Sequence, residues 1–218
     1  MHPINIAPSI LSANFAHLMD DIHRIENNAT MLHIDVMDGH YVPNITMGVP
    51  VIQSIRKETN MIFDVHLMIE SPEKLVDIFA DAGSDIITFH IETSDDPDKL
   101  IEHIHQLGKR AGISIHPDTP IEKVFPYLAK IDLILIMAVR PGFGGQKFLP
   151  QSLTRVEIVR KKLDDINSKA ILSVDGGVTT ITAPQIICSG ADVLVAGSAV
   201  FGKENPEKAL EELRTCVM

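Results

Sequence analysis

The stretch LHIDVMDGHY, residues 32–41, alternates apolar and polar side chains. Leu32, Ile34 and Val36 alternate with His33 and Asp35, and a period of two residues is typical of a β-strand. If the apolar positions pack against a core, the histidine and the carboxylate share the opposite face. Burial of that face would be costly unless both groups were paired. The stretch therefore predicts a buried strand whose polar face needs a partner.

Short apolar runs rich in Ile and Val recur along the chain, and amphipathic helical patterns separate them. Strands that alternate with helices indicate βαβ units and a parallel sheet. Eight units of about 27 residues fit a closed barrel. An open doubly wound sheet usually has a glycine-rich loop after its first strand, where this chain has LSANF. We therefore predict an α/β fold, a (β/α)8 TIM barrel formed by residues 1–218 as a single domain. Its strands are expected in the runs 4–10, 31–38, 61–69, 85–91, 111–116, 133–139, 170–176 and 193–198.

Several expected helices begin with a recognisable signal. In four places a residue that commonly caps helices is followed by proline, an arrangement typical of a helix N-terminus. The four predicted caps are Ser71, Asp96, Thr119 and Asn205.

Composition narrows the class of protein. Hydrophobic residues make up 45% and charged residues 22% of the 218, a balance that can fill a globular core. The formal net charge of −10 argues against nucleic acid or an anionic membrane as partner. The first residues resemble no signal peptide, and no apolar stretch is long enough to span a bilayer. We expect a cytoplasmic protein.

Polar residues gather near the predicted C-terminal ends of the strands, where TIM barrels carry their active sites. Among them, His33, Asp35, His66 and Asp175 combine imidazole and carboxylate groups, which suit an ion such as Zn, Mn, Fe or Co. The alternative is a set of separately hydrogen-bonded polar side chains. A cation would compensate carboxylates that the strands otherwise bury unpaired.

Three methionines, Met37, Met68 and Met137, approach the ends of predicted strands two, three and six. They are either core filler or a dry, polarizable wall around a reacting carbon.

The loop RPGFGGQ, residues 140–146, follows the sixth predicted strand. Its glycines allow the backbone to turn N–H groups toward an anion. One such loop can be only a turn, but VDGG and AGS follow strands seven and eight. Barrels often hold phosphate near their last two strands. We therefore predict a small phosphate ester as ligand, held by backbone donors rather than by a basic face.

Six segments together resemble the ribulose-phosphate 3-epimerase family: APSILSANF, LHIDVMDGHYVPN, DVHLM, VRPGFGGQKF, VDGGV and VAGSAVF. The likeness runs from Ile6 to Phe201 with every motif in order. It implies a (β/α)8 barrel that interconverts D-ribulose 5-phosphate and D-xylulose 5-phosphate in the pentose phosphate pathway.

The resemblance also implies roles for individual residues. One divalent metal ion would be bound by His33, Asp35, His66 and Asp175. Asp35 and Asp175 would be the acid–base pair that moves the C3 proton through an enediolate. Expected partners are a sugar phosphate and, in a homo-oligomer, further copies of the chain. The residues assigned to the substrate are Ser9, Met37, His66, Met68, Met137, Gly142, Phe143, Gly144, Gly145, Gly176, Gly177, Gly197 and Ser198.

Some positions depart from the family's usual pattern, and they leave the sugar open. Ile91, His116 and Arg140 fall on one arc of the predicted mouth. Arg140 is either solvated or paired to an acid such as Glu92, or it reaches the site and alters sugar choice. The alternative functions are a D-allulose-6-phosphate 3-epimerase, then a decarboxylase or aldolase on a related phosphate-binding barrel, and last a sugar-phosphate sensor without catalysis.

Overall fold

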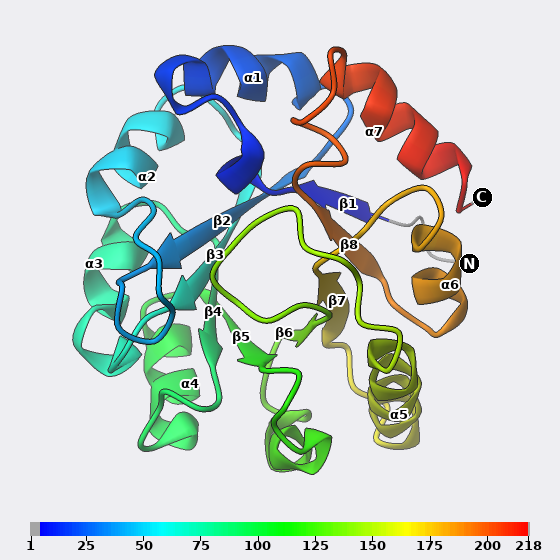
Figure 1. Ribbon diagram of the computed structural model, residues 1–218. Coiled ribbons are helices and arrows are strands. Elements are labelled where there is room, and N and C mark those ends of the chain that lie inside the picture. Colours follow the sequence, from blue (N-terminus) through cyan, green and yellow to red (C-terminus); the bar gives the residue numbers. More distant parts are fainter. Residues whose placement is uncertain (1–4, 218) are drawn as a thin grey trace.

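The computed structural model describes residues 5–217, and within them eight parallel strands form one sheet in the order β1-β8-β7-β6-β5-β4-β3-β2. An isolated parallel bridge between Ser9 and His33 joins the two outer strands, so the sheet closes into a barrel, seen end-on in Figure 1. The predicted (β/α)8 fold is confirmed, although Ile4 and the outer ends of the predicted domain lie outside the described residues. The strands are β1 (Asn5–Pro8), β2 (Met31–Met37), β3 (Ile62–Met68), β4 (Ile86–His90), β5 (Arg110–Ile115), β6 (Leu133–Met137), β7 (Ile171–Asp175) and β8 (Val193–Ala196).

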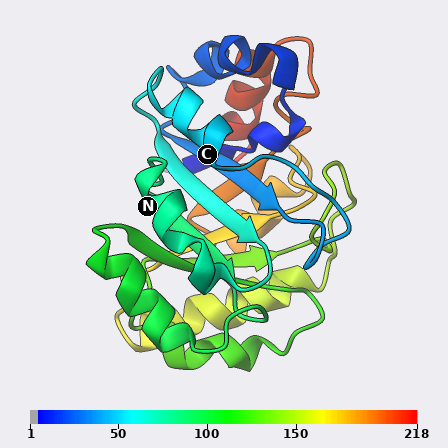
Figure 2. The same cartoon turned by 90° about the vertical axis from the view of Figure 1, so that its left-hand side faces the viewer.

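Helices surround the ring of strands, as the views in Figures 1 and 2 show. Within residues 5–217 no helix is long and apolar enough to cross a membrane. The α-helices are α1 (Leu18–Ile25), α2 (Val49–Arg56), α3 (Val76–Asp81), α4 (Pro97–Gln106), α5 (Ser152–Asp165), α6 (Ala183–Cys188) and α7 (Pro206–Thr215). The 3-10 helices are η1 (Ile10–Ser12), η2 (Phe15–His17), η3 (Pro72–Lys74) and η4 (Ile121–Tyr127).

Two of the four predicted helix caps are confirmed. Asp96 and Asn205 each accept a hydrogen bond from the backbone N–H three residues further on. Ser71 has a left-handed backbone with φ of 51° and makes no capping bond, so that prediction is wrong. The segment after Thr119 forms the 3-10 helix η4, whose cap position is Pro120, so the predicted cap at Thr119 is wrong. In an α-helix the ring of Pro126 would clash with the carbonyl four residues earlier.

Strand β2 has the predicted alternation. Leu32, Ile34 and Val36 belong to the large apolar cluster between the sheet and the helices. His33 and Asp35 face the interior of the barrel, where they are 0% and 3% exposed. A second apolar cluster fills much of the rest of that interior. It comprises Ala7, Met31, Ile86, Leu133, Leu135, Met137, Val139, Val193 and Val195.

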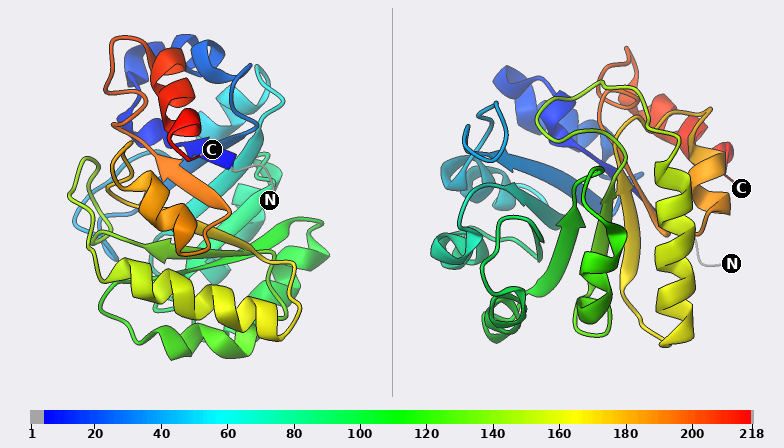
Figure 3. Two further views of the ribbon diagram at one scale, coloured as in Figure 1. Left: turned by 90° about the vertical axis from the view of Figure 1, so that its right-hand side faces the viewer. Right: turned by 60° about the horizontal axis from the view of Figure 1, so that its bottom comes forward.

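The connection between β6 and α5 arches across one end of the barrel, above the strand ends in the tilted view of Figure 3. Gln146 folds this loop by donating from Nε2 to the carbonyl oxygens of Arg140 and Phe143, at 2.7 and 2.8 Å. The Asn44 side chain, from the loop after β2, donates to the carbonyl of Gly142 at 2.8 Å. Two loops therefore meet over the end at which the polar residues gather.

Candidate active site

Four side chains from three strands converge at this end of the barrel. One possible ligand atom each from His33, Asp35, His66 and Asp175 lies within 4.8 Å of the others. His33 Nε2 and His66 Nδ1 lie 3.3 and 3.2 Å from Oδ1 of Asp35. The register of β2 against β3 sets Asp35 directly beside His66. The four residues predicted to hold a metal ion thus form one cluster.

Two further groups hold this cluster in place. Ser9 donates from Oγ to Oδ2 of Asp35 at 2.6 Å. Asp64 is 0% exposed, and its Oδ2 lies 2.8 Å from Nδ1 of His33. Its other oxygen, Oδ1, accepts a hydrogen bond from the Thr88 hydroxyl at 3.0 Å. A carboxylate on Nδ1 favours a hydrogen there and leaves Nε2 of His33 free to face Asp35. The sequence analysis missed Asp64, although its spacing of two from His66 was a usable signal.

The pKa values of the two aspartates in the cluster are shifted in opposite directions. Burial raises the pKa of Asp175 to about 7, and the negative charge of Asp35 adds to the effect. Burial alone would raise the pKa of Asp35 too, but His33 and His66 outweigh it and hold that pKa well below its usual range. Burial lowers the pKa of His66, while Asp35 and Asp64 overcome burial at His33 and raise its pKa. Paired carboxyls whose pKa values are pushed apart are typical of acid–base catalysis.

The cluster fits a divalent transition ion. Two imidazole nitrogens and two carboxylates are donors that Zn, Fe, Mn and Co all accept. Burial, and after it the negative charge of Asp35, raise the pKa of Asp175, and a nearby cation would favour the ionised carboxylate against both effects. The same donor set leaves the identity of the metal open.

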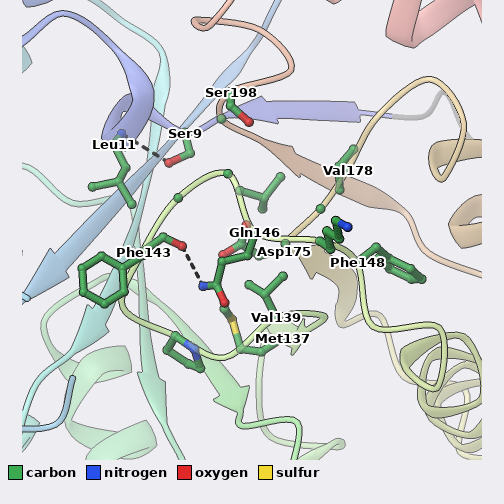
Figure 4. Close-up of a pocket in the computed structure, with 18 of the residues that line it drawn as sticks. Ser9, Leu11, Met137, Val139, Phe143, Gln146, Phe148, Asp175, Val178 and Ser198 are labelled. Carbon is green, nitrogen blue, oxygen red and sulfur yellow. Dashed lines mark hydrogen bonds between the residues drawn. The ribbon is translucent and has the colours of Figure 1, made fainter. Parts of the chain in front are cut away.

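A cavity of about 560 Å³ opens above the cluster, a volume suited to a small ligand. Figure 4 shows Ser9, Asp175 and Ser198 around it, with the loop of Phe143 and Gln146 crossing it. His66 is 0% exposed and is not among the described residues that line the cavity, so its predicted contact with substrate has no support in this geometry. The other residues predicted to touch substrate all line it: Ser9, Met37, Met68, Met137, Gly142, Phe143, Gly144, Gly145, Gly176, Gly177, Gly197 and Ser198.

One side of the cavity consists largely of glycine loops. Gly177 has φ of +64°, and a Cβ there would lie 2.3 Å from the backbone nitrogen of Phe148. A Cβ on Gly197 would lie 2.6 Å from the hydroxyl of Ser12. The close approach to the Phe148 backbone requires glycine at position 177, whereas the Ser12 hydroxyl could rotate away from a Cβ at position 197. Both glycines present only backbone to the ligand. Ser12 and Lys147, which sequence analysis missed, also line this cavity.

Comparison with known proteins places the chain in a family. Residues 5–201 match the model of the ribulose-phosphate 3 epimerase family. The chain belongs to this family. A ribulose-phosphate 3-epimerase of Bacillus subtilis is 45% identical over 213 residues, which cover 97% of this chain and 98% of the relative. A rice relative named as the cytoplasmic isoform of the enzyme is 44% identical, over 97% of this chain and 93% of its own.

Solved structures of low sequence identity share the fold of this family member. KGPDC from Streptococcus mutans aligns with a TM-score of 0.73 at 14% identity, over 99% of this chain and 98% of its own. The 3-hexulose-6-phosphate synthase of Salmonella typhimurium aligns with a TM-score of 0.72 at 18% identity, over 98% of each chain. At these identities the likeness shows the barrel fold alone.

The positions that depart from the family pattern lie beside the cavity rather than in it. Arg140 forms a two-pronged ion pair with Asp118, with Nε and Nη2 at 3.2 and 3.1 Å from Oδ2. The expected pairing with a nearby acid is confirmed, but the acid is Asp118 rather than Glu92. His116 and Arg140 line a smaller neighbouring pocket, and Ile91 packs against the apolar core. These contacts favour a structural role for the exposed Arg140 side chain.

Proposed function

We propose that the protein catalyses epimerisation at C3 of a ketose phosphate and interconverts D-ribulose 5-phosphate and D-xylulose 5-phosphate. Its membership of the epimerase family supports the reaction class. The observation that carries the proposal is the pair Asp35 and Asp175, two carboxyls that belong to one cluster and line one cavity.

The chemistry needs a proton removed from one face of C3 and another delivered to the opposite face. An ionised Asp35 accepts the C3 proton, and the electron pair of the broken C–H bond forms the C2–C3 double bond of an enediolate. Protonated Asp175 then delivers its proton to the other face of C3, which restores the ketone with inverted configuration. In the reverse direction the two groups exchange roles. No oxidant or reductant is consumed, because only protons move.

We infer that His33, Asp35, His66 and Asp175 hold one divalent metal ion. When bound, the ion supplies positive charge close to the substrate oxygens on which negative charge develops. The chain itself orients the donors: Asp64 holds the ring of His33, and the Ser9 hydroxyl holds one oxygen of Asp35.

The rest of the cavity suits a phosphorylated sugar. Met37, Met68 and Met137 are nearly fully buried and form an apolar wall beside Asp35 and Asp175, which excludes water from the reacting carbon. We assign the phosphate to the glycine loops at 142–145, 176–177 and 197–198, where backbone faces the cavity.

The test is turnover in deuterated water followed by proton NMR. The metal-loaded protein should convert D-ribulose 5-phosphate to D-xylulose 5-phosphate that carries deuterium at C3. D-Ribulose without phosphate should react far more slowly. A metal-loaded protein that leaves ribulose 5-phosphate unchanged would refute the proposal, and a higher kcat/KM for D-allulose 6-phosphate would assign the six-carbon substrate instead.

A further inference from the structure

The ring of His66 lies between two partners. Its Nδ1 lies 3.2 Å from Oδ1 of Asp35, and its Nε2 lies 2.9 Å from Nε2 of His90. Both histidines are 0% exposed, so water does not separate the rings. Of two neutral imidazole nitrogens at this distance, one donates a hydrogen and the other accepts it. The direction of this bond decides whether Nδ1 of His66 keeps a free lone pair toward Asp35.

Glu92 sets that direction. Its Oε2 lies 3.2 Å from Nδ1 of His90. An ionised carboxylate only accepts, so the hydrogen of His90 belongs on Nδ1. Nε2 of His90 is then bare and accepts from Nε2–H of His66. Nδ1 of His66 is left unprotonated toward Asp35, an arrangement that the positive charge of a bound cation would compensate. We propose that Glu92 is a positioning residue that acts through His90 to fix His66 in the tautomer a metal ion requires. The inference rests on the proposed metal site.

Glu92 is itself held so that its two oxygens have different partners. Oε1 accepts from the backbone N–H of His116 at 2.9 Å. Arg155 fixes that loop from outside, because its guanidinium donates to the carbonyl oxygens of His116 and Thr119 at 3.1 and 2.8 Å. A glutamine could satisfy the N–H of His116 only with its oxygen. Its amide NH2 would then face His90 and reverse the whole chain of hydrogen bonds.

Tyr41 offers the competing arrangement. Its hydroxyl lies 2.9 Å from Nδ1 of His90, and as a donor there it would turn the bond between the two histidines around. That arrangement would set the bare Nδ1 of His90 against the carboxylate of Glu92, with two lone pairs facing each other. We therefore assign the hydrogen to His90 and the accepting role to Glu92. Neither Glu92 nor His90 is among the described residues that line the large cavity, so their effect on the site is indirect.

The first experiment measures Zn²⁺ affinity by competition with a chromogenic chelator. Glu92→Gln should weaken binding by roughly 10- to 100-fold, the usual effect of losing a partner behind a metal ligand. Tyr41→Phe should leave affinity within about 3-fold, as should Glu122→Gln, a matched change at an exposed position on η4. Equal affinity in wild type and Glu92→Gln overturns the inference, and so does an equal loss in Tyr41→Phe. Wild type that binds no Zn²⁺ overturns the proposed metal site itself.

The second experiment needs no variant. Ring ¹⁵N NMR of the Zn²⁺-loaded wild type should show the hydrogen of His90 on Nδ1, and a hydrogen on Nε2 would refute the assignment. A third experiment uses a His90→Gln background, in which the amide oxygen can accept from His66 directly. Glu92→Gln should then cost less than 3-fold in Zn²⁺ affinity, whereas an undiminished cost would show that Glu92 does not act through His90.

Discussion

Replacement of Asp175 by asparagine should stabilise the metal-free protein while stopping epimerisation. Burial raises the pKa of this carboxyl from 3.8 to about 7. A group that binds its proton more tightly in the folded state destabilises that state once the pH exceeds the unfolded pKa. The destabilisation grows as the pH rises from about 4 to 7 and is complete above that. Asparagine has nearly the same shape and no charge, so it removes the cost.

The size of the effect follows from the same shift. Each tenfold change in proton affinity corresponds to about 1.4 kcal/mol, so the ionised carboxyl costs up to about 4 kcal/mol. Asp175 keeps a partly exposed edge in the cavity, and water there reduces the figure to about 2–4 kcal/mol. Between pH 5 and pH 8 the advantage of the variant should grow by about 2 kcal/mol.

Urea unfolding with a chelator present, at pH 5 and pH 8, measures this advantage. Excess Zn²⁺ should reverse the order, because the wild type binds the ion more tightly and gains more stability from it. The reasoning fails if Asp175→Asn is no more stable than wild type at pH 8 without metal. It also fails if the difference between the two proteins is the same at both pH values.

Four further substitutions, one of them a control, test other parts of the site. Asp64→Asn should weaken Zn²⁺ binding by roughly 10- to 100-fold in a chelator competition, because His33 loses its charged partner; unchanged affinity would remove Asp64 from the account. Gly177→Ala should raise KM or abolish activity, because the new Cβ would collide with the backbone of Phe148 and the residue has a positive φ. The control Gly145→Ala also has a positive φ but has open space around its Cβ, so it should cost only about 1 kcal/mol of stability. Activity of Gly177→Ala equal to wild type would contradict the close approach. Arg140→Asn should leave the ratio of kcat/KM for five- and six-carbon sugar phosphates within about 3-fold, since Arg140 pairs with Asp118 beside the cavity; a larger shift would show that its guanidinium reaches the sugar.

The fold could be predicted from the sequence because its signals are local. The alternation in β2 and the position of Asp175 at the end of β7 depend on strand period alone, and the structure has both as expected. Thr119 was misjudged because Pro126, further along, prevents an α-helix. Local patterns mark where a helix can start, and a proline within the next turns decides whether it continues.

The residues that hold the site in place were harder to predict, because their contacts depend on the register between neighbouring strands and on the reach of long side chains. Asp64 meets His33 only through the pairing of β2 with β3. Arg140 has several carboxylates within reach of its flexible side chain, and spacing along the chain does not select Asp118 over Glu92. The chain of hydrogen bonds from Glu92 through His90 to His66 crosses two strands, so no sequence window contains it.

The most direct test of the two-base account is hydrogen exchange at C3 in deuterated water with Asp35→Asn and Asp175→Asn. The metal content of each variant must be measured, because both residues are also proposed ligands. A metal-loaded variant keeps one carboxyl, which can remove and return a proton on one face of C3 without inverting it. The account predicts that each variant slowly exchanges the C3 hydrogen of one epimer only, and that the two variants prefer opposite epimers. The account is contradicted if one aspartate is required for exchange in both epimers and the other for neither.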